Sequence, residues 1–129
     1  MVNSNKQKGD RAELEIARLI YDQLGIPIRR KLGAGRADDT GDLDGIPNTA
    51  AQVANWADTL RAVREKPVAV EQQRANAGAL FAVSFIRTRG GIWRAVMTVE
   101  QWATYAREAM RPDLIDPQGP AAGEQAALI

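Results

Sequence analysis

Three short segments contain side chains whose types and order could support metal-dependent chemistry. Glu13 ends the run KGDRAE at residues 8–13, Asp42 follows Gly41, and Gln52 comes ten residues after Asp42. Carboxylate and amide oxygens are the ligands that a hard cation such as Mg²⁺ or Mn²⁺ prefers, and a bound cation can activate water. On the two strands of a hairpin, Asp42 and Gln52 would lie within a few ångströms of each other. Glu13, Asp42 and Gln52 are therefore the predicted ligands of a divalent metal ion.

The residue types that the chain lacks exclude several other kinds of chemistry. The sequence contains no cysteine and no histidine. It therefore has no disulfide framework, thiolate nucleophile or zinc knuckle, and no imidazole base or Ser-His-Asp triad. Catalysis by this chain would have to use carboxylates, lysine, hydroxyl groups or a hard metal ion.

The net charge of +1 is divided among four segments of alternating sign. Residues 1–36 carry a net charge of +4, residues 37–58 carry −5, residues 59–98 carry +5 and residues 99–129 carry −3. An acidic segment between two basic ones suits a metal-dependent nucleic-acid enzyme, in which carboxylates hold the cation and basic residues bind phosphates. The alternative interpretation is a solvated acidic loop on a mildly basic domain.

The elements that must position these residues begin with a helix. Apolar residues recur at helical spacing from Asp10 onwards, and Gly25 ends the predicted helix, while the polar residues before Asp10 are expected to be frayed. Residues 26–32 predict an extended strand with three consecutive cations, and residues 33–41 predict a glycine-rich loop.

A hairpin is predicted next, followed by two helical runs. Residues 42–46 and 49–56 predict its two strands, and strand alternation places Gln52 and Ala54 on the same face. Residues 57–66 predict an amphipathic helix that Pro67 breaks or restarts, and a second helical run then continues to the stop at Gly78.

A second hairpin and a final helix complete the prediction. Residues 80–87 and 92–98 predict two strands joined by a tight turn that contains Gly90 and Gly91. Thr98 and Gln101 fit a capping box for a helix that runs to about Met110. We expect this helix to bury Val99, Trp102, Tyr105 and Ala109.

The predicted order of elements, αβββαββα, gives an α/β fold with a mixed central sheet flanked by helices. The length of 129 residues suits one domain, which we expect at residues 1–110, with a tail lacking regular structure at residues 111–129. No apolar run approaches the ~18 residues that cross a bilayer, and no signal-peptide pattern opens the sequence. We therefore expect a cytoplasmic protein without membrane contact.

The ordered set of motifs resembles a known nuclease superfamily. The run KGDRAELEIARLI, the basic strand, the GAG loop, the Gly-Asp pair and the strand ending in QVAN resemble the PD-(D/E)XK endonucleases, and within them the archaeal and phage Holliday junction resolvases. The resemblance covers roughly residues 6–98. It implies a PD-(D/E)XK nuclease-like sheet, Mg²⁺-dependent hydrolysis of phosphodiester bonds in branched DNA with a 3′ oxygen as leaving group, and a twofold homodimer on a four-way junction. It also implies a bacterial or phage-infected host cell.

The resemblance also implies a role for each matching residue. Asp42 matches the metal-binding aspartate, Gln52 matches a second ligand that is usually Asp or Glu, and Glu13 matches the helix glutamate. Ala54 stands where the family has its catalytic lysine, which is thought to position the attacking water and to stabilise charge at phosphorus. Alanine can do neither, so the chain is expected to bind metal and DNA but to cleave slowly or not at all. Ala54 would then mark an engineered inactive form, which the intact remainder of the motif favours, or a naturally disabled paralogue.

Basic residues that flank the predicted site are expected to contact DNA phosphates: Lys8, Arg11, Arg29, Arg30, Lys31 and Arg36. The second hairpin could extend this track through Arg87, Arg89 and Arg94. The alternative is a solvated strand edge that its charges keep soluble. The three tryptophans are interpreted as core or dimer-interface residues rather than platforms for bases: Trp56, Trp93 and Trp102.

Three other functions remain open at the level of the sequence. A mismatch or restriction-type nickase on the same fold would use the same metal ligands on a different DNA structure. A non-catalytic DNA-binding pseudonuclease would retain the fold with a native Ala54. A structural adaptor would show no salt-dependent binding to DNA at all.

Overall fold

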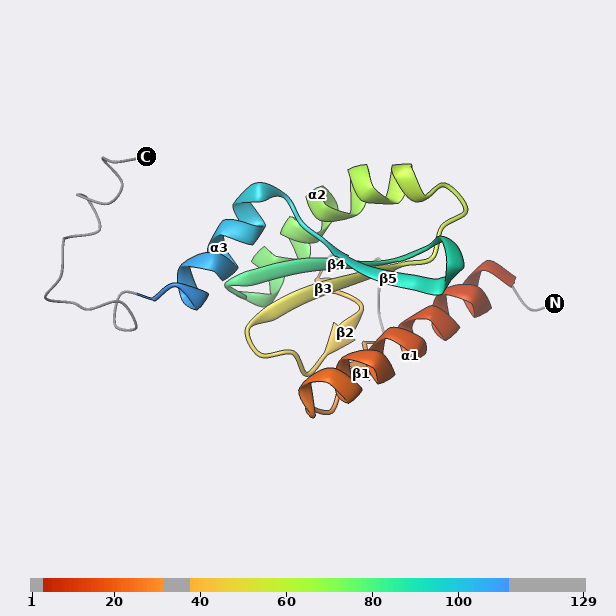
Figure 1. The fold of residues 1–129 in the computed structure, drawn as a ribbon, viewed down its shortest axis with the longest axis horizontal. Helices are drawn as coiled ribbons and strands as arrows, with labels where there is room; N and C mark the ends of the chain where they lie inside the picture. The colour runs from red at the N-terminus through yellow and green to blue at the C-terminus, as the bar shows by residue number, and fades with distance from the viewer. Residues whose placement is uncertain (1–3, 32–37, 112–129) are drawn as a thin grey trace, which may run out of the picture.

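The computed structural model describes residues 4–31 and 38–111 and shows a mixed α/β arrangement (Figure 1). Its elements are α1 (Ser4–Leu24), β1 (Arg29–Arg30), β2 (Leu43–Asp44), β3 (Thr49–Ala54), α2 (Thr59–Ala77), β4 (Phe81–Thr88), a 3₁₀ turn (Arg89–Gly91), β5 (Ile92–Val96) and α3 (Val99–Ala109). The predicted order of helices and strands is confirmed. Arg36, most of the predicted glycine-rich loop and the tail from residue 112 onwards lie outside the described residues.

The strands form two small sheets. β3, β4 and β5 are neighbours in that order, with β3 parallel to β4 and β4 antiparallel to β5, while β1 pairs antiparallel with β2. Parallel neighbours need a crossover between them, and α2 supplies it. In Figure 1, α2 lies along one side of the three-stranded sheet and α1 along the other.

The core follows the alternation of side chains along β3 and β4. Ala51 and Val83 face α1 and pack with Ile16 and Ile20, whereas Ala50, Ala54 and their partners on β4 face α2 in two further clusters. Both faces of β3 are therefore covered, which places any polar side chain on this strand in a largely buried environment.

Two sequence predictions about the N-terminal half are wrong in detail. α1 begins at Ser4 rather than Asp10, because the polar residues before Asp10 extend the helix in place of fraying. The strands predicted at residues 26–32 and 42–46 shrink to the two-residue β1 and β2, and β2 pairs with β1 rather than forming a ladder with β3. Gly45 explains the short β2, because its φ of 114° and its close approach to the Pro27 carbonyl turn the chain away.

The helix predicted to break or restart at Pro67 is one continuous helix. α2 runs from Thr59 to Ala77 with Pro67 inside it, and Asp58 and Gly78 cap its two ends. A proline inside a helix removes one hydrogen bond and costs about 3 kcal/mol. Pro67 is buried between α2 and its neighbours, so tertiary packing offsets this local preference.

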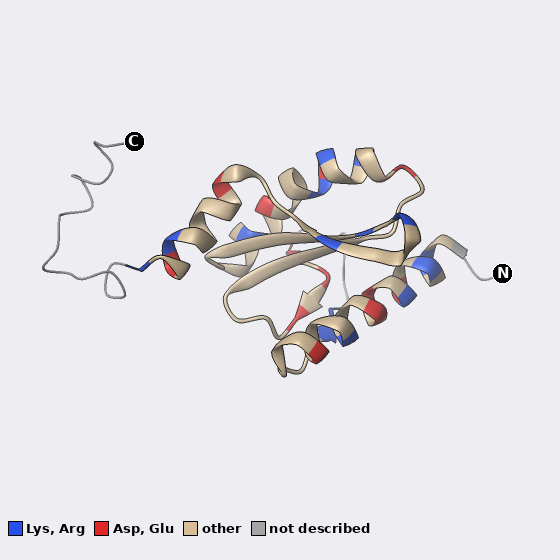
Figure 2. Cartoon of the chain, viewed as in Figure 1, with Lys and Arg blue, Asp and Glu red and all other residues tan. Residues whose placement is uncertain are grey.

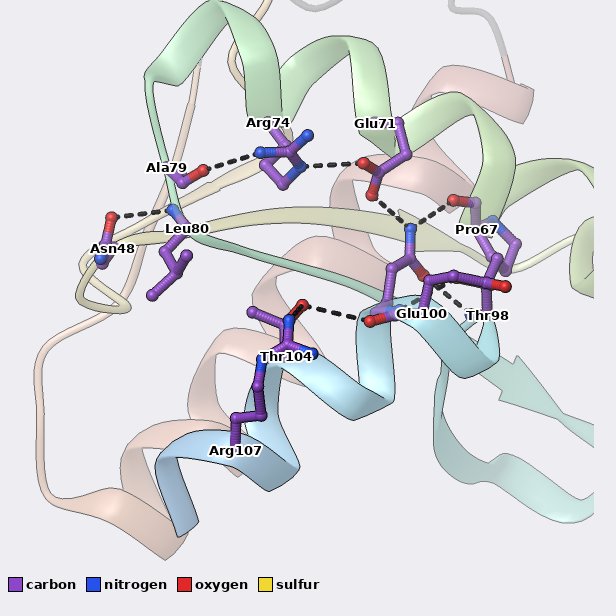
Figure 3. Close-up of polar contacts among 11 residues, drawn as sticks. Asn48, Pro67, Glu71, Arg74, Ala79, Leu80, Thr98, Glu100, Thr104 and Arg107 are labelled. Carbon is purple, nitrogen blue, oxygen red and sulfur yellow. Dashed lines mark hydrogen bonds and ion pairs between the residues drawn. The ribbon is translucent and has the colours of Figure 1, made fainter. Parts of the chain in front are cut away.

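The capping box of α3 is confirmed, but of the four residues predicted to be buried only Tyr105, which stacks on Phe81, is partly buried. Thr98 and Gln101 exchange the two bonds of the box, whereas Val99 and Trp102 are 74% and 55% exposed and Ala109 is also exposed. Gln101 is the buried residue of the helix. Its amide nitrogen donates to the Pro67 carbonyl at 2.7 Å and to the Glu71 carboxylate at 2.6 Å, in the network of Figure 3 that ties α3 to α2.

Replacing Gln101 with Met is expected to lower the free energy of unfolding by about 1–3 kcal/mol. The thioether fills a similar volume but leaves the Glu71 carboxylate and the Thr98 amide without the bonds that Gln101 provides. Urea denaturation measures the change. The control is Thr104→Ala, because the Thr104 hydroxyl donates to the Glu100 carbonyl and accepts from the Arg107 guanidinium, both on the same helix. Equal midpoints for both variants would contradict a linking role for Gln101.

Within the described residues, no helix is both long and apolar enough to cross a membrane.

Candidate active site

Asp42 is held in place by hydrogen bonds to two neighbouring segments. Its backbone N–H donates to the Ala51 carbonyl at 2.7 Å, and its carbonyl accepts the Lys31 N–H at 2.8 Å. Its side-chain Oδ2 accepts the Val53 N–H at 2.8 Å. Gly41 makes this approach possible, because it has a φ of 113° and a Cβ there would lie 2.8 Å from the Ala51 carbonyl oxygen. The Asp42 carboxylate is thus fixed at the edge of β3.

Burial of the Asp42 carboxylate raises its pKa, and the charge of Asp39 raises it further. The Val53 N–H and the positive charge of Lys66 oppose this and lower the pKa. Since burial is the largest cause, the folded chain holds an acidic group whose ionised form lacks full solvation. A cation beside this carboxylate would supply that missing stabilisation.

α2 packs on β3 with matching residue spacings. Every fourth residue on one face of the helix lies over every second residue on one face of the strand. Ala62 packs with Ala54, Lys66 meets Gln52, and Val70 packs with Ala50. Four residues advance a helix by about 6 Å and two residues advance a strand by about 6.6 Å, so the two rows stay aligned. Lys66 therefore reaches the strand between two apolar contacts.

Lys66 is a further candidate residue of this site, and the sequence alone did not predict it. Its ammonium donates to Gln52 Oε1 at 3.0 Å, lies 5.0 Å from the centre of the Trp56 ring, and is close enough to Asp42 to lower the pKa of that carboxyl. Gln52 itself is 6% exposed. A lysine fourteen residues downstream carries no local signal, although the spacing of Ala62, Lys66 and Val70 marks one helix face.

Glu13 approaches the site from α1 on the other side of β3. Burial and the charge of Asp42 raise the Glu13 pKa, while Arg30 lowers it. The Arg30 guanidinium lies 3.5 Å from Glu13 and 2.7 Å from Asp10, so it bridges two carboxylates one helical turn apart. Arg30, predicted to contact DNA, is therefore engaged within the protein.

The segment before Asp42 is anchored to α2. Asp39 accepts the Gly41 N–H through one carboxylate oxygen and the Gln73 amide through the other, and its carbonyl accepts the Asn76 amide. Lys31 bonds the Thr40 hydroxyl at 2.7 Å. α2 thus positions both ends of the site, through Lys66 and through the loop that leads to Asp42.

Three buried polar atoms in this region lack a hydrogen-bond partner. One is Nε of Arg30, which lies 3.5 Å from Glu13. The other two are the Ser84 hydroxyl, which lies next to Gln52 in the β3–β4 register, and Oε1 of Gln73 on α2. Buried polar groups are normally paired. The unpaired Ser84 and Gln73 atoms show that the interior between α2 and the sheet is polar near Gln52.

The side-chain oxygens of Asp42 and Gln52 suit a hard cation, and the negative charge at this site comes from Asp42 and Glu13. Asp42 bonds the backbone of β3 at Val53, next to the buried Gln52, and the charge of Asp42 raises the pKa of Glu13. Among the residues that the structure describes, no three Asp, Glu, His or Cys side chains gather closely enough to hold a metal by themselves. Gln52 Oε1 already accepts one cation, the Lys66 ammonium, and an amide oxygen has two lone pairs.

The other residues predicted to bind DNA differ in where they lie relative to this site. Lys8 lines a hollow of about 530 Å³ together with Ala54, Trp56 and Arg61. Arg11 and Arg29 are exposed on α1 and β1. Figure 2 shows basic and acidic residues interspersed along α1 and acidic residues at β2.

Two arginines and the remaining tryptophans lie away from the site. Arg87 and the Trp93 indole both bond Glu15 of α1, at 3.0 and 2.8 Å. Arg94 bonds the Thr88 hydroxyl across the second hairpin. Only Trp56 among the three tryptophans touches the side chains of the candidate site.

Glu13→Gln is expected to weaken Mn²⁺ binding by about 10–100-fold, because it removes a negative charge beside Asp42. Since the Glu13 pKa is raised, protons compete with the metal more strongly than at an ordinary carboxylate, so affinity should fall as pH decreases. This fall should be shallower in the variant. Titration followed by the electron paramagnetic resonance signal of free Mn²⁺, from mildly acidic to neutral pH, measures both.

Glu15→Gln is the matched control, because the Glu15 carboxylate faces Arg87 and Trp93 instead. Equal Mn²⁺ affinity in the wild-type chain and the Glu13 variant would remove Glu13 from the metal site.

Comparison with known proteins gives no family assignment. No family model, no curated protein and no solved structure matches this chain.

Proposed function

We propose that this chain is a metal-dependent endonuclease that hydrolyses phosphodiester bonds in DNA. By its resemblance to Holliday junction resolvases, four-way junctions or other branched DNA are its substrates. Mg²⁺ is the proposed cofactor, and Mn²⁺ can replace it. The proposal includes a twofold homodimer, because a four-way junction offers two symmetric strands to cut.

One observation carries this proposal: Asp42 bonds β3 at the residue after the buried Gln52, whose amide oxygen accepts the Lys66 ammonium. Oδ2 of Asp42 accepts the N–H of Val53, the residue that follows Gln52, while the Lys66 ammonium bonds Gln52 and lowers the pKa of Asp42 through its charge. The three residues come from separate elements, so the fold brings together an acid, an oxygen donor and a cation. This combination suits the binding of a metal ion and a phosphate side by side.

Each residue has a distinct task in the proposed reaction. Asp42 and Gln52 would hold the ion, and Glu13 would add negative charge from α1. When bound, the ion supplies a Lewis acid and lowers the pKa of water for in-line attack on the phosphodiester. Val53 orients the Asp42 carboxylate through its N–H, and the α1 and α2 layers exclude bulk water from Gln52.

The distribution of basic residues supports a polyanionic substrate. Lys8 and Arg61 line the hollow beside Ala54, Arg11 is exposed on α1, which also lines it, and Arg29 is exposed on β1. Such residues bind the DNA backbone through charge and without regard to sequence. A nickase on duplex DNA or a non-catalytic DNA-binding module would share this feature, so binding alone does not separate these alternatives.

The test compares a labelled four-way junction with a duplex and a single strand of matching sequence. Binding is measured in Ca²⁺ over a series of salt concentrations, and Mg²⁺ or EDTA is then added to the bound complexes. We expect preferential binding to the junction, a salt-dependent affinity, and cleavage of opposite strands in Mg²⁺ alone.

Each other result selects another function. Cleavage of the duplex as fast as the junction would support the nickase. Salt-dependent binding without cleavage in Mg²⁺ or Mn²⁺ would support the pseudonuclease. The absence of DNA binding would overturn the proposal altogether.

A further inference from the structure

We propose that Lys66 of α2 contacts the scissile phosphate and supplies the positive charge that Ala54 cannot, so that the chain is an active enzyme with its alanine in place. This inference rests on the proposed function and deepens it. It replaces the expectation that Ala54 leaves the chain inactive.

The reaction itself creates the need for such a group. In-line attack on a phosphodiester develops negative charge on the non-bridging and leaving oxygens, and a fixed cation at that point stabilises the transition state more than the ground state. The side chain of Ala54 is 3% exposed and packs on Ala62 and Ile86. No cation can come from that position of β3.

The two alanines instead allow Lys66 to take this position. Because Ala54 and Ala62 are both small, α2 lies close to the end of β3, and the next residue of the same helix face is Lys66. On the other side of Lys66 along the helix, Val70 packs on Ala50 and fixes the distance between α2 and β3 there. Larger side chains at Ala54 and Ala62 would move the helix away from Gln52. The alanine at position 54 therefore belongs to the packing that delivers the lysine.

The ammonium of Lys66 is also held in a defined orientation. Gln52 accepts one hydrogen bond from it at 3.0 Å, and the Trp56 ring lies 5.0 Å away. An ammonium has three N–H donors, so donors remain for phosphate oxygens after the bond to Gln52. The Trp56 ring beside this ammonium also lines the hollow with Lys8 and Ala54, which provides room for a DNA backbone.

The test uses Lys66→Ala and Lys66→Met, the second of which keeps an aliphatic chain on Trp56 while removing the charge. Arg64→Ala is the control, because Arg64 is exposed on α2 and its loss changes the net charge equally. Single-turnover cleavage of the junction is measured at saturating Mg²⁺. A second measurement follows DNA affinity against salt concentration in EDTA, where no metal contributes.

We expect both Lys66 variants to cleave about 10²–10³-fold more slowly than the wild-type chain, with Arg64→Ala close to wild type. In EDTA, removal of one phosphate contact should reduce the slope of log affinity against log salt by about 0.9 in the Lys66 variants. Thermal unfolding of all variants identifies any loss of fold, and the Met variant guards against lost packing.

The outcomes separate the two proposals. If the wild-type chain cleaves in Mg²⁺ and the Lys66 variants cleave equally fast, the inference is overturned and the proposed function stands; Lys66 then only neutralises Asp42. If the wild-type chain does not cleave, the proposed function fails. The salt slope in EDTA then decides the phosphate contact by itself, because an unchanged slope in the Lys66 variants would overturn it.

Discussion

Asp42→Asn is expected to reduce Mg²⁺-dependent cleavage of DNA by at least about 10²–10³-fold while leaving the fold intact. Asparagine keeps the size of the side chain, and its amide oxygen can still accept the Val53 N–H that now bonds Asp42 Oδ2 at 2.8 Å. Only the charge that attracts the metal is lost. Single-turnover cleavage at saturating DNA measures the effect.

The same substitution has a predictable effect on stability. Burial raises the Asp42 pKa, so the folded chain binds this proton more tightly than the unfolded chain does. The free energy of unfolding contributed by Asp42 therefore falls as pH rises from the ordinary carboxyl pKa to the raised one, and the loss persists above it. At neutral pH without metal, the Asn variant should be at least as stable as the wild-type chain.

Metal should reverse this order of stabilities. A ligand present at 100 times its dissociation constant stabilises the folded state by about 2.7 kcal/mol. Mg²⁺ should thus raise the melting temperature of the wild-type chain but not that of Asp42→Asn. Asp44→Asn is the control, because Asp44 is exposed on β2 and lies opposite Arg29. A metal-induced shift that survives in Asp42→Asn would place the metal elsewhere.

Gly41→Ala is expected to damage both the fold and the site. The added Cβ would lie 2.8 Å from the Ala51 carbonyl oxygen, at a φ of 113° that L-residues rarely adopt. Strain and displacement together should lower the free energy of unfolding by about 2–4 kcal/mol. The backbone must shift where Asp42 donates to Ala51. Since a displacement of ~1 Å at a reacting group can cost ~10²-fold in rate, the folded variant should also cleave poorly.

Gly9→Ala is the matched control for this substitution. Gly9 lies inside α1 and a Cβ there meets no atom within 4 Å, so alanine should stabilise the chain by about 0.5–1 kcal/mol. Urea denaturation of both variants tests the contrast. If Gly41→Ala unfolds at the wild-type midpoint and cleaves at the wild-type rate, the close approach of Gly41 to β3 does not position Asp42.

The features that the sequence predicted well are those with a local physical cause. The capping box at Thr98 and Gln101 depends on two residues three positions apart, and it is confirmed. The hairpin of β4 and β5 is signalled by Gly90 and Gly91, which both adopt a positive φ in the turn. The predicted approach of Asp42 to the strand that carries Gln52 fits the short connection between them, although β2 forms its ladder with β1 and not with β3.

The features that the sequence did not predict depend on tertiary packing. Pro67 has a strong local preference to end a helix, but its burial in the fold overrides this preference, and its carbonyl accepts the Gln101 amide of α3. The face of α3 was misjudged because Gln101, a polar residue, is buried through bonds to another helix. Lys66 was missed for the same reason, since only the register of α2 on β3 brings it to Gln52.

The most direct test of the central claim is cleavage of a labelled four-way junction by the unmodified chain in Mg²⁺, with protein in excess. EDTA and the Asp42→Asn variant, purified in parallel, are run beside it. Cutting of opposite strands in Mg²⁺ alone, absent in EDTA and in the variant, is the predicted result. A junction that is bound but uncut in both Mg²⁺ and Mn²⁺, or one that is cut equally by Asp42→Asn, would contradict a metal-dependent nuclease centred on Asp42.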